Sequence, residues 1–403
     1  MDQMHQHNPA KMNCTSRRFG PAPELPEGAR VIGEGEFAHT PARAVVVPEW
    51  FTCIGDGAFA GCRNLVRAEI RCPIEVIPDK LFKFCTALNE VIVPDTVRVV
   101  GKDAFASCWS LEEIILPPWL EVIRARAFED CGALSLLVIP GSVRRIGTAA
   151  FRDCAALQAV IMPASLEAVS NEMFDGCSSL ESIAIPDSVI EIGSSAFWGC
   201  RALRAIALPA ALKRIKYSAF EGCLALESVI IPDATARIGD RAFAHCDALK
   251  TAVLPASLEV FGEGAFLNRR SLETVVIPGT LRSIGPSAFE GCRSLRYISL
   301  PDSLEEICDF AFYDCRSLER VAIPNSVRRI GAWAFCGCES LREVVLPDSV
   351  EVVEPSAFAR CRSLERIVIP GTLRELGENA FAGCVSLKCP LPAIVEESIM
   401  ASC

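Results

Sequence analysis

The residues that could do chemistry in this sequence are its 21 cysteines, its four histidines and one arginine at an unexpected position. Cys246 stands between His245 and Asp247, an order that could place a thiol nucleophile beside a base. Fourteen cysteines occupy one equivalent position of a repeat, however, and thirteen of them have no adjacent histidine. We therefore expect Cys246 to be a structural residue and the chain not to be an enzyme.

The position of these cysteines predicts free thiols rather than disulfides. Each stands three residues after a phenylalanine, the count of cysteines is odd, and the chain is too long to need covalent staples. Equivalent side chains of stacked coils point in parallel and not at one another, which disfavours a bond between them. Free cysteine is among the most buried residue types, so the sequence predicts a buried column of thiols and a reducing compartment.

Arg269 is the one exception in this column, because it replaces the cysteine after Phe266. An unpaired arginine is costly to bury, so we expect a local outward turn of the backbone there. The alternative is a bent site that exposes Arg269 and Arg270 to an acidic partner.

The cysteines belong to a repeat of 23 residues. Fifteen phenylalanines, from Phe59 to Phe381, follow one another at this spacing without a slip, and a leucine stands six residues after each. A fixed period of this length is typical of a stacked repeat protein, in which each coil buries its apolar face only against its neighbours. A degenerate coil containing Phe37 precedes the array.

Each coil predicts two short strands and a turn of tight helix. Phe, Cys and Leu at spacings of three share one face of such a turn. A mostly aliphatic and largely β-branched triplet such as Ile114-Ile115-Leu116 follows, with its middle residue outward, and a proline ends it in thirteen coils. Val143 and Ile146 represent a second, bent strand in which both side chains point inward. The predicted fold is a solenoid of parallel strands and helical turns.

We expect the solenoid to span residues 25–388 in about 16 coils, between a disordered segment or loose cap at 1–24 and a cap or tail at 389–403. His5, His7 and Cys14 could in principle bind a metal, but their spacing is unlike any compact zinc site, and we expect neither a metal nor a cofactor. The sequence shows no secretory signal and no membrane-spanning run. A net charge of −10 argues against binding nucleic acid.

The pattern resembles a known family. The segment IPGSVRRIGTAAFRDCAAL (residues 139–157) is similar to the BspA-like leucine-rich repeat, and the resemblance covers about nine-tenths of the chain. It implies a right-handed leucine-rich-repeat solenoid with a concave sheet, and binding rather than catalysis. Members of this family are often surface proteins that bind host or matrix proteins.

The best candidate for a binding site is a column of apolar residues, the outward middle residues of the first strand in successive coils. One expects polar residues on a solvated sheet face, and contiguous apolar surface often marks an interaction site. The residues predicted to bind a protein are Ile92, Ile115, Val138, Ile161, Ile230, Val253, Val276, Val345 and Val368. We call this set the apolar column.

The apolar column is also compatible with two roles that involve no partner. Its residues could merely favour strands, because β-branched side chains fit a pleated surface. They could also mediate weak self-association. Our main prediction is a cytoplasmic protein-interaction scaffold that binds a protein partner along the apolar concave sheet. The alternative is a BspA-like cell-surface adhesin or antigen that reaches the surface by a route the sequence does not show.

Overall fold

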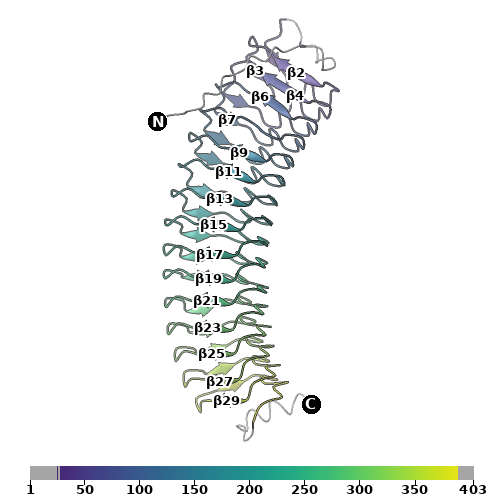
Figure 1. Cartoon of the computed structure of the whole chain (residues 1–403). Coiled ribbons are helices and arrows are strands. Elements are labelled where there is room, and N and C mark those ends of the chain that lie inside the picture. The colour runs from purple at the N-terminus through teal and green to yellow at the C-terminus, as the bar shows by residue number, and fades with distance from the viewer. Residues whose placement is uncertain (1–24, 26–27, 389–403) are drawn as a thin grey trace, which may run out of the picture.

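A computed structural model describes residue 25 and residues 28–388. The coils lie one above another and form an elongated, gently curved solenoid (Figure 1). Every strand pairing in this part of the chain is parallel, and partners stand 23 residues apart except at the first pair, Val31 with Cys53. The predicted fold class is confirmed, with one change to the turns that is described below.

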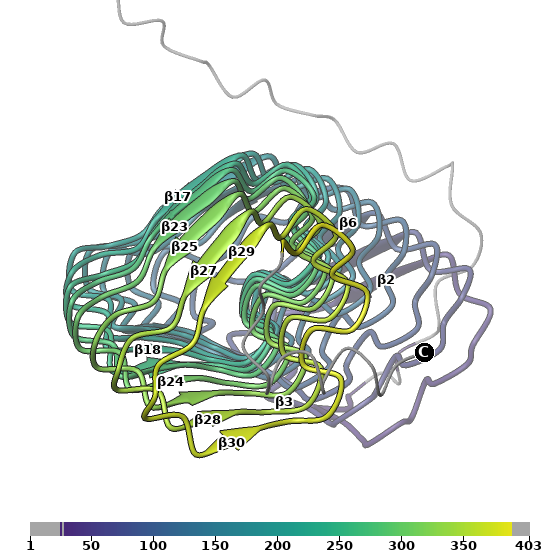
Figure 2. The same ribbon diagram turned by 90° about the horizontal axis from the view of Figure 1, so that it is seen from below.

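The strands form two columns on two sides of the core (Figure 2). Strands of the first column have three or four residues, and their successive side chains alternate in burial. They are β2 Ala44–Val47, β4 Arg67–Ile70, β6 Glu90–Ile92, β9 Leu136–Val138, β11 Ala159–Ile161, β13 Ser182–Ala184, β15 Ala205–Ala207, β17 Ser228–Ile230, β19 Thr251–Val253, β21 Thr274–Val276, β23 Tyr297–Ser299, β25 Arg320–Ala322, β27 Glu343–Val345 and β29 Arg366–Val368.

Strands of the second column have two residues, of which the second points inward. They are β1 Val31–Ile32, β3 Cys53–Ile54, β5 Val76–Ile77, β7 Val99–Val100, β8 Val122–Ile123, β10 Arg145–Ile146, β12 Ala168–Val169, β14 Glu191–Ile192, β16 Arg214–Ile215, β18 Arg237–Ile238, β20 Val260–Phe261, β22 Ser283–Ile284, β24 Glu306–Ile307, β26 Arg329–Ile330, β28 Val352–Val353 and β30 Glu375–Leu376. Val143 and Ile146 are both buried, as the bend in this segment predicted.

Phenylalanine rings form a continuous stack through the core. From Phe37 to Phe381, the ring of each repeated phenylalanine lies on the next with centroids 5.1–5.8 Å apart and planes within 23°. Complete burial of one such ring contributes roughly 1.5–3 kcal/mol. The stack holds neighbouring coils in register and thereby aligns the strands on both sides.

The predicted helical turn is wrong: the described residues contain no helix. Around Phe151, both Ala149 and Asp153 have a positive φ, 56° and 58°, and equivalent residues of other coils share this conformation. It turns the backbone N–H groups of Ala149, Phe151 and Asp153 along the solenoid axis, where they donate to carbonyl oxygens of the next coil at 2.7–3.1 Å. A helix would direct these groups back along its own turn, so the third side is a ribbon of hydrogen-bonded turns instead.

Candidate protein-interaction surface

The apolar column lies on the outward face of the first strands, as its spacing predicted. Strand pairing sets its members in line, for example Ile230 beside Val253 and Val253 beside Val276. Eight of its nine residues are exposed, from 42% for Ile92 to 85% for Ile115, and Val368 is half-buried. Between them the same position holds small residues, as at Ala184 and Ala207, so the strip of apolar atoms is nearly continuous.

The inward neighbours of the column explain why these side chains must face outward. In β17, Val229 is buried between the exposed residues Ser228 and Ile230, because successive side chains of a strand alternate between faces. A shift of one residue would exchange the two faces and expose the core. The exposure of the column therefore follows from the packing of the core, and the sequence alone decides that the exposed residues are apolar.

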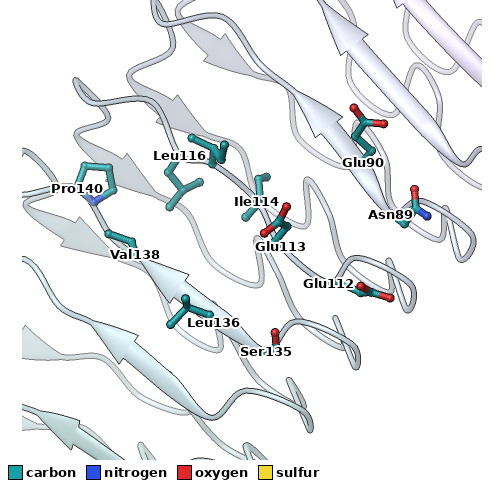
Figure 3. Close-up of a pocket in the computed structure, with 11 residues that line it drawn as sticks. Asn89, Glu90, Glu112, Glu113, Ile114, Leu116, Ser135, Leu136, Val138 and Pro140 are labelled. Atoms are coloured by element: carbon teal, nitrogen blue, oxygen red, sulfur yellow. The ribbon is translucent and has the colours of Figure 1, made fainter. Parts of the chain in front are cut away.

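One coil of the first column forms no strand, and the ladder of this column also breaks between β11 and β13 and between β15 and β17. Residues 113–116 form no strand. Residues 112–116 share only one backbone hydrogen bond with a neighbouring coil, which Ser135 N donates to Glu112 O at 3.2 Å. The predicted strand Ile114-Ile115-Leu116 is therefore wrong. Its coil lies between β6 and β9, where a cavity of about 740 Å³ opens on the face of the apolar column (Figure 3).

Two features of the sequence account for this interruption. Glu90 and Glu113 stand at equivalent positions of adjacent coils, and like charges directly opposite each other weaken strand pairing. Pro117 and Pro118 follow the triplet, so two consecutive residues lack an N–H and restrict the backbone before them. The proline pair is the signal that sequence reasoning could have used to find this opening.

His245 and Cys246 do not form a catalytic pair. The Cys246 thiol is fully buried and donates to the carbonyl oxygen of Phe220 at 3.1 Å. His245 instead lines a separate surface hollow of about 280 Å³, together with Asp247 and Arg270. No nucleophile and base therefore meet at this position.

Within residues 28–388, no three His, Cys, Asp or Glu side chains lie close enough together to hold a metal ion. His5, His7 and Cys14 lie outside the described residues.

The cysteine column is buried and free of disulfides across the described residues, as predicted. Sequence reasoning missed its hydrogen bonds. All fourteen cysteines that follow a repeated phenylalanine donate through Sγ to a phenylalanine carbonyl oxygen of the preceding coil, at 3.1–3.4 Å. The thiols thus satisfy buried backbone acceptors and are more than small apolar side chains.

The expected outward turn at Arg269 is wrong. Its side chain is fully buried, and none of its three guanidinium nitrogens has a hydrogen-bond partner within the described part of the chain. Burial lowers the pKa of this guanidinium. Continuous stacking of Phe243, Phe266 and Phe289 holds the coil in register, which keeps position 269 inside. In the preceding coil, Leu249 N donates a hydrogen bond to Cys246 O, but Leu272 N makes no such bond to Arg269 O. The effect of Arg269 on the backbone is therefore confined to its own turn.

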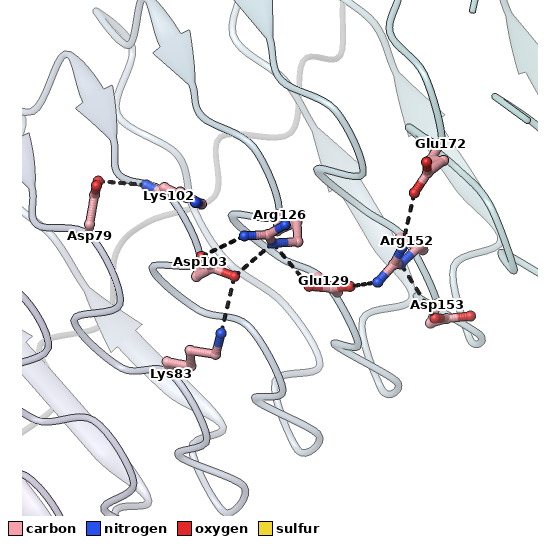
Figure 4. A network of polar contacts seen from close by, with 9 residues as sticks. All are labelled: Asp79, Lys83, Lys102, Asp103, Arg126, Glu129, Arg152, Asp153 and Glu172. Atoms are coloured by element: carbon pink, nitrogen blue, oxygen red, sulfur yellow. Dashed lines mark hydrogen bonds and ion pairs between the residues drawn. The ribbon is translucent and has the colours of Figure 1, made fainter. Parts of the chain in front are cut away.

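Charged residues outside the column connect neighbouring coils. The carboxyl of Asp103 is 1% exposed and lies 3.0 Å from Arg126 and 3.2 Å from Lys83 (Figure 4). Burial would raise the pKa of Asp103, but its hydrogen bonds to Arg126 and Lys83 outweigh burial and hold the pKa below its ordinary value. Arg152 donates to Glu172 in the same way, at 2.9 Å. These groups form ion pairs between neighbouring coils, so we assign them to stability.

The repeat pattern of the BspA type leucine rich repeat region, in six copies, matches residues 22–135, 121–250, 167–282 and 259–388. The chain belongs to the BspA-type leucine-rich repeat family. No curated protein is significantly similar to it. Among solved structures, a leucine-rich repeat protein from Bacteroides ovatus is 30% identical over 86% of each chain, with a TM-score of 0.69.

A second similar structure is a leucine rich cell surface protein from Faecalibacterium prausnitzii. It is 25% identical over 90% of this chain and 86% of its own, with a TM-score of 0.48. Membership of the BspA-type family agrees with a scaffold built for interaction. The described part of this BspA-type chain contains no helix with the length and hydrophobicity that crossing a bilayer requires.

Proposed function

We propose that this BspA-type protein is a non-enzymatic scaffold that binds a protein partner along the apolar column. The observation that carries the proposal is the run of exposed aliphatic side chains on successive paired strands, including Ile161, Ile230 and Val253. Removing such surface from water contributes about 25 cal/mol per Å². A partner that lies across the strands can therefore add the contributions of many coils.

The regular geometry of the column suits a long partner segment. The coils hold their side chains on paired strands, and the strands are fixed from behind by the buried Phe stack. A rigid surface of this kind loses little conformational entropy on binding. Charged residues are rare in the column itself, so apolar contacts would supply most of the affinity and the flanking residues would set specificity.

Capture of partners by the purified full chain tests this proposal. Ile161→Lys/Ile230→Lys/Val253→Lys places three charges in the column and should abolish capture, while far-ultraviolet circular dichroism stays unchanged. The matched control is Val76→Lys/Ile190→Lys/Val260→Lys, which places the same charges at exposed apolar residues on the second side. Capture that survives in the column variant, or is lost equally in the control, contradicts the proposal.

Family membership favours a second proposal about where the scaffold acts. The resemblance to the BspA-like family implied a surface protein that binds host or matrix proteins, and the family match favours this cell-surface adhesin or antigen over the cytoplasmic location that we first expected. The buried thiols are compatible with either place, because oxidants reach them poorly. Protease treatment of intact cells decides between the two: digestion of the protein supports the surface, and protection excludes it.

Self-association through the column is the remaining alternative. It predicts that the sedimentation coefficient of the wild-type chain rises with concentration and that the triple column variant abolishes this rise. A wild-type chain that stays monomeric excludes this use of the column.

A further inference from the structure

The opening between β6 and β9 differs from the rest of the apolar column in three ways. It is a cavity of about 740 Å³ at a coil that forms no strand on this face. It contains Ile115, whose side chain is 85% exposed and is the most exposed of the column. It is also lined by Glu112 and Glu113, whose carboxylates lie beside aliphatic side chains of the same cavity (Figure 3).

The backbone at this opening is available for hydrogen bonding. The N–H and C=O groups of residues 113–115 make no backbone hydrogen bond to β6 or to β9. Unpaired backbone groups of a strand-like segment are the groups to which an extended peptide adds. β6 pairs with β4 and β9 pairs with β11, and the coil between β6 and β9 is the one within residues 44–368 that forms no strand on this face.

The charge at the opening is not neutralised by the protein. Glu90 forms an ion pair with Arg67 at 2.8 Å, but Glu112 and Glu113 form none within residues 28–388. Leu136 and Val138 line the same cavity and are exposed, as Ile115 is, so the three side chains form one apolar surface. The opening thus presents two uncompensated negative charges beside three aliphatic side chains.

We propose that this opening binds an extended peptide segment of the partner in which basic residues alternate with apolar ones. Successive side chains of an extended chain point to opposite faces. Lys or Arg side chains on the outer face of such a segment can reach Glu112 and Glu113, while the apolar side chains on its other face pack toward Ile114 and Leu116. The proposal rests on the binding function of the apolar column and names the chemistry recognised at one end of it. An acidic segment would be repelled.

Fluorescence anisotropy with a defined peptide tests the site on the full-length protein. The probe is a labelled, end-blocked hexapeptide of alternating lysine and valine, and the comparison peptides carry glutamate or serine in place of lysine. We expect the basic peptide to bind most tightly and its affinity to fall as salt rises. Equal binding of the acidic peptide overturns the proposal.

Variants of the chain locate the binding. Glu112→Gln/Glu113→Gln should weaken the basic peptide about fivefold at low salt, the combined effect of two exposed ion pairs. The matched control Glu181→Gln/Glu227→Gln removes two exposed carboxylates elsewhere on the first side and should leave the affinity unchanged. An equal loss in the control shows general charge attraction and overturns the site.

The two proposals can fail separately. Peptide binding that survives Glu112→Gln/Glu113→Gln removes this site and leaves binding along the column intact. Partner capture that survives the lysine variant of Ile161, Ile230 and Val253 removes the column, and the peptide measurement still reports on the opening by itself.

Discussion

The thiol of Cys200 donates a hydrogen bond to the carbonyl oxygen of Phe174 in the preceding coil, at 3.2 Å. Both residues are fully buried, so water cannot replace this donor. The pairing recurs at every repeated cysteine described, and it links the cysteine column to the phenylalanine stack. The two repeated residue types therefore act as one unit, in which the ring fills the core and the thiol satisfies its neighbour's backbone.

Cys200→Ala should lower the free energy of unfolding by about 1–3 kcal/mol. The substitution leaves the carbonyl oxygen of Phe174 buried without its donor and leaves a small void. Urea denaturation followed by circular dichroism measures the change. Cys53 is exposed and has no place in the column, so Cys53→Ala serves as the control. Equal stability of the two variants would show that the thiol bond contributes nothing.

The column thiols should resist alkylation in the native protein at pH 8. Burial raises the pKa of the Cys154 thiol to about 12, so the reactive thiolate is scarce at that pH and the sulfur is also inaccessible. Peptide mapping after iodoacetamide treatment should find Cys53 modified rapidly and Cys154 modified only after addition of denaturant. Rapid native modification of Cys154 would contradict a closed core.

Arg269→Cys should stabilise the protein by about 2–4 kcal/mol. The variant removes a buried guanidinium without partners and restores a donor for the carbonyl oxygen of Phe243, the acceptor equivalent to those of the other coils. Thermal and urea denaturation should both report the gain. Arg270 is exposed, and Arg270→Ala should leave stability almost unchanged. A destabilised Arg269→Cys variant would mean that the arginine has a partner inside the folded chain.

Asp175 should make the protein less stable as pH rises from about 4 to about 6. Burial, together with the charges of Asp153 and Glu172, raises the pKa of Asp175 to about 6. The folded state then holds its proton more tightly than the unfolded state, whose pKa is about 3.9. This contribution is therefore present below pH 4 and is lost as pH rises through 6.

The matched measurement uses Asp175→Asn. Because the carboxyl is only half-buried, the variant should gain about 1 kcal/mol over the wild type at pH 7, and the two should be equally stable near pH 3.5. A difference that is constant across this range would show that Asp175 does not titrate with folding.

Sequence reasoning predicted the parts of the fold that depend on apolar spacing. The positions of Phe151, Val143 and Ile146 follow from the period alone, because each must be buried between two copies of itself. The turns were mispredicted, because spacings of three also suit a helix. The missed signal is the glycine that other coils carry at the position of Asp153, such as Gly176 and Gly199, which also have a positive φ.

The candidate site was predictable in position but not in shape. Alternation along a strand places Ile161 and Ile230 outward whatever the details of the coil. The opening at Glu113 depends on how like charges and two prolines act together in one coil. These features of a single coil do not appear in the consensus pattern of the repeat. Arg269 shows the opposite case, in which the register of the whole stack overrides the preference of one side chain.

Hydrogen–deuterium exchange of the chain in complex with its captured partner tests the central claim most directly. Binding along the apolar column predicts slower exchange in the first strands from β9 to β21, residues 136–276, and unchanged exchange in the second strands and turns of the same coils. Protection confined to the second strands or to the turns, with the first strands unaffected, would contradict it.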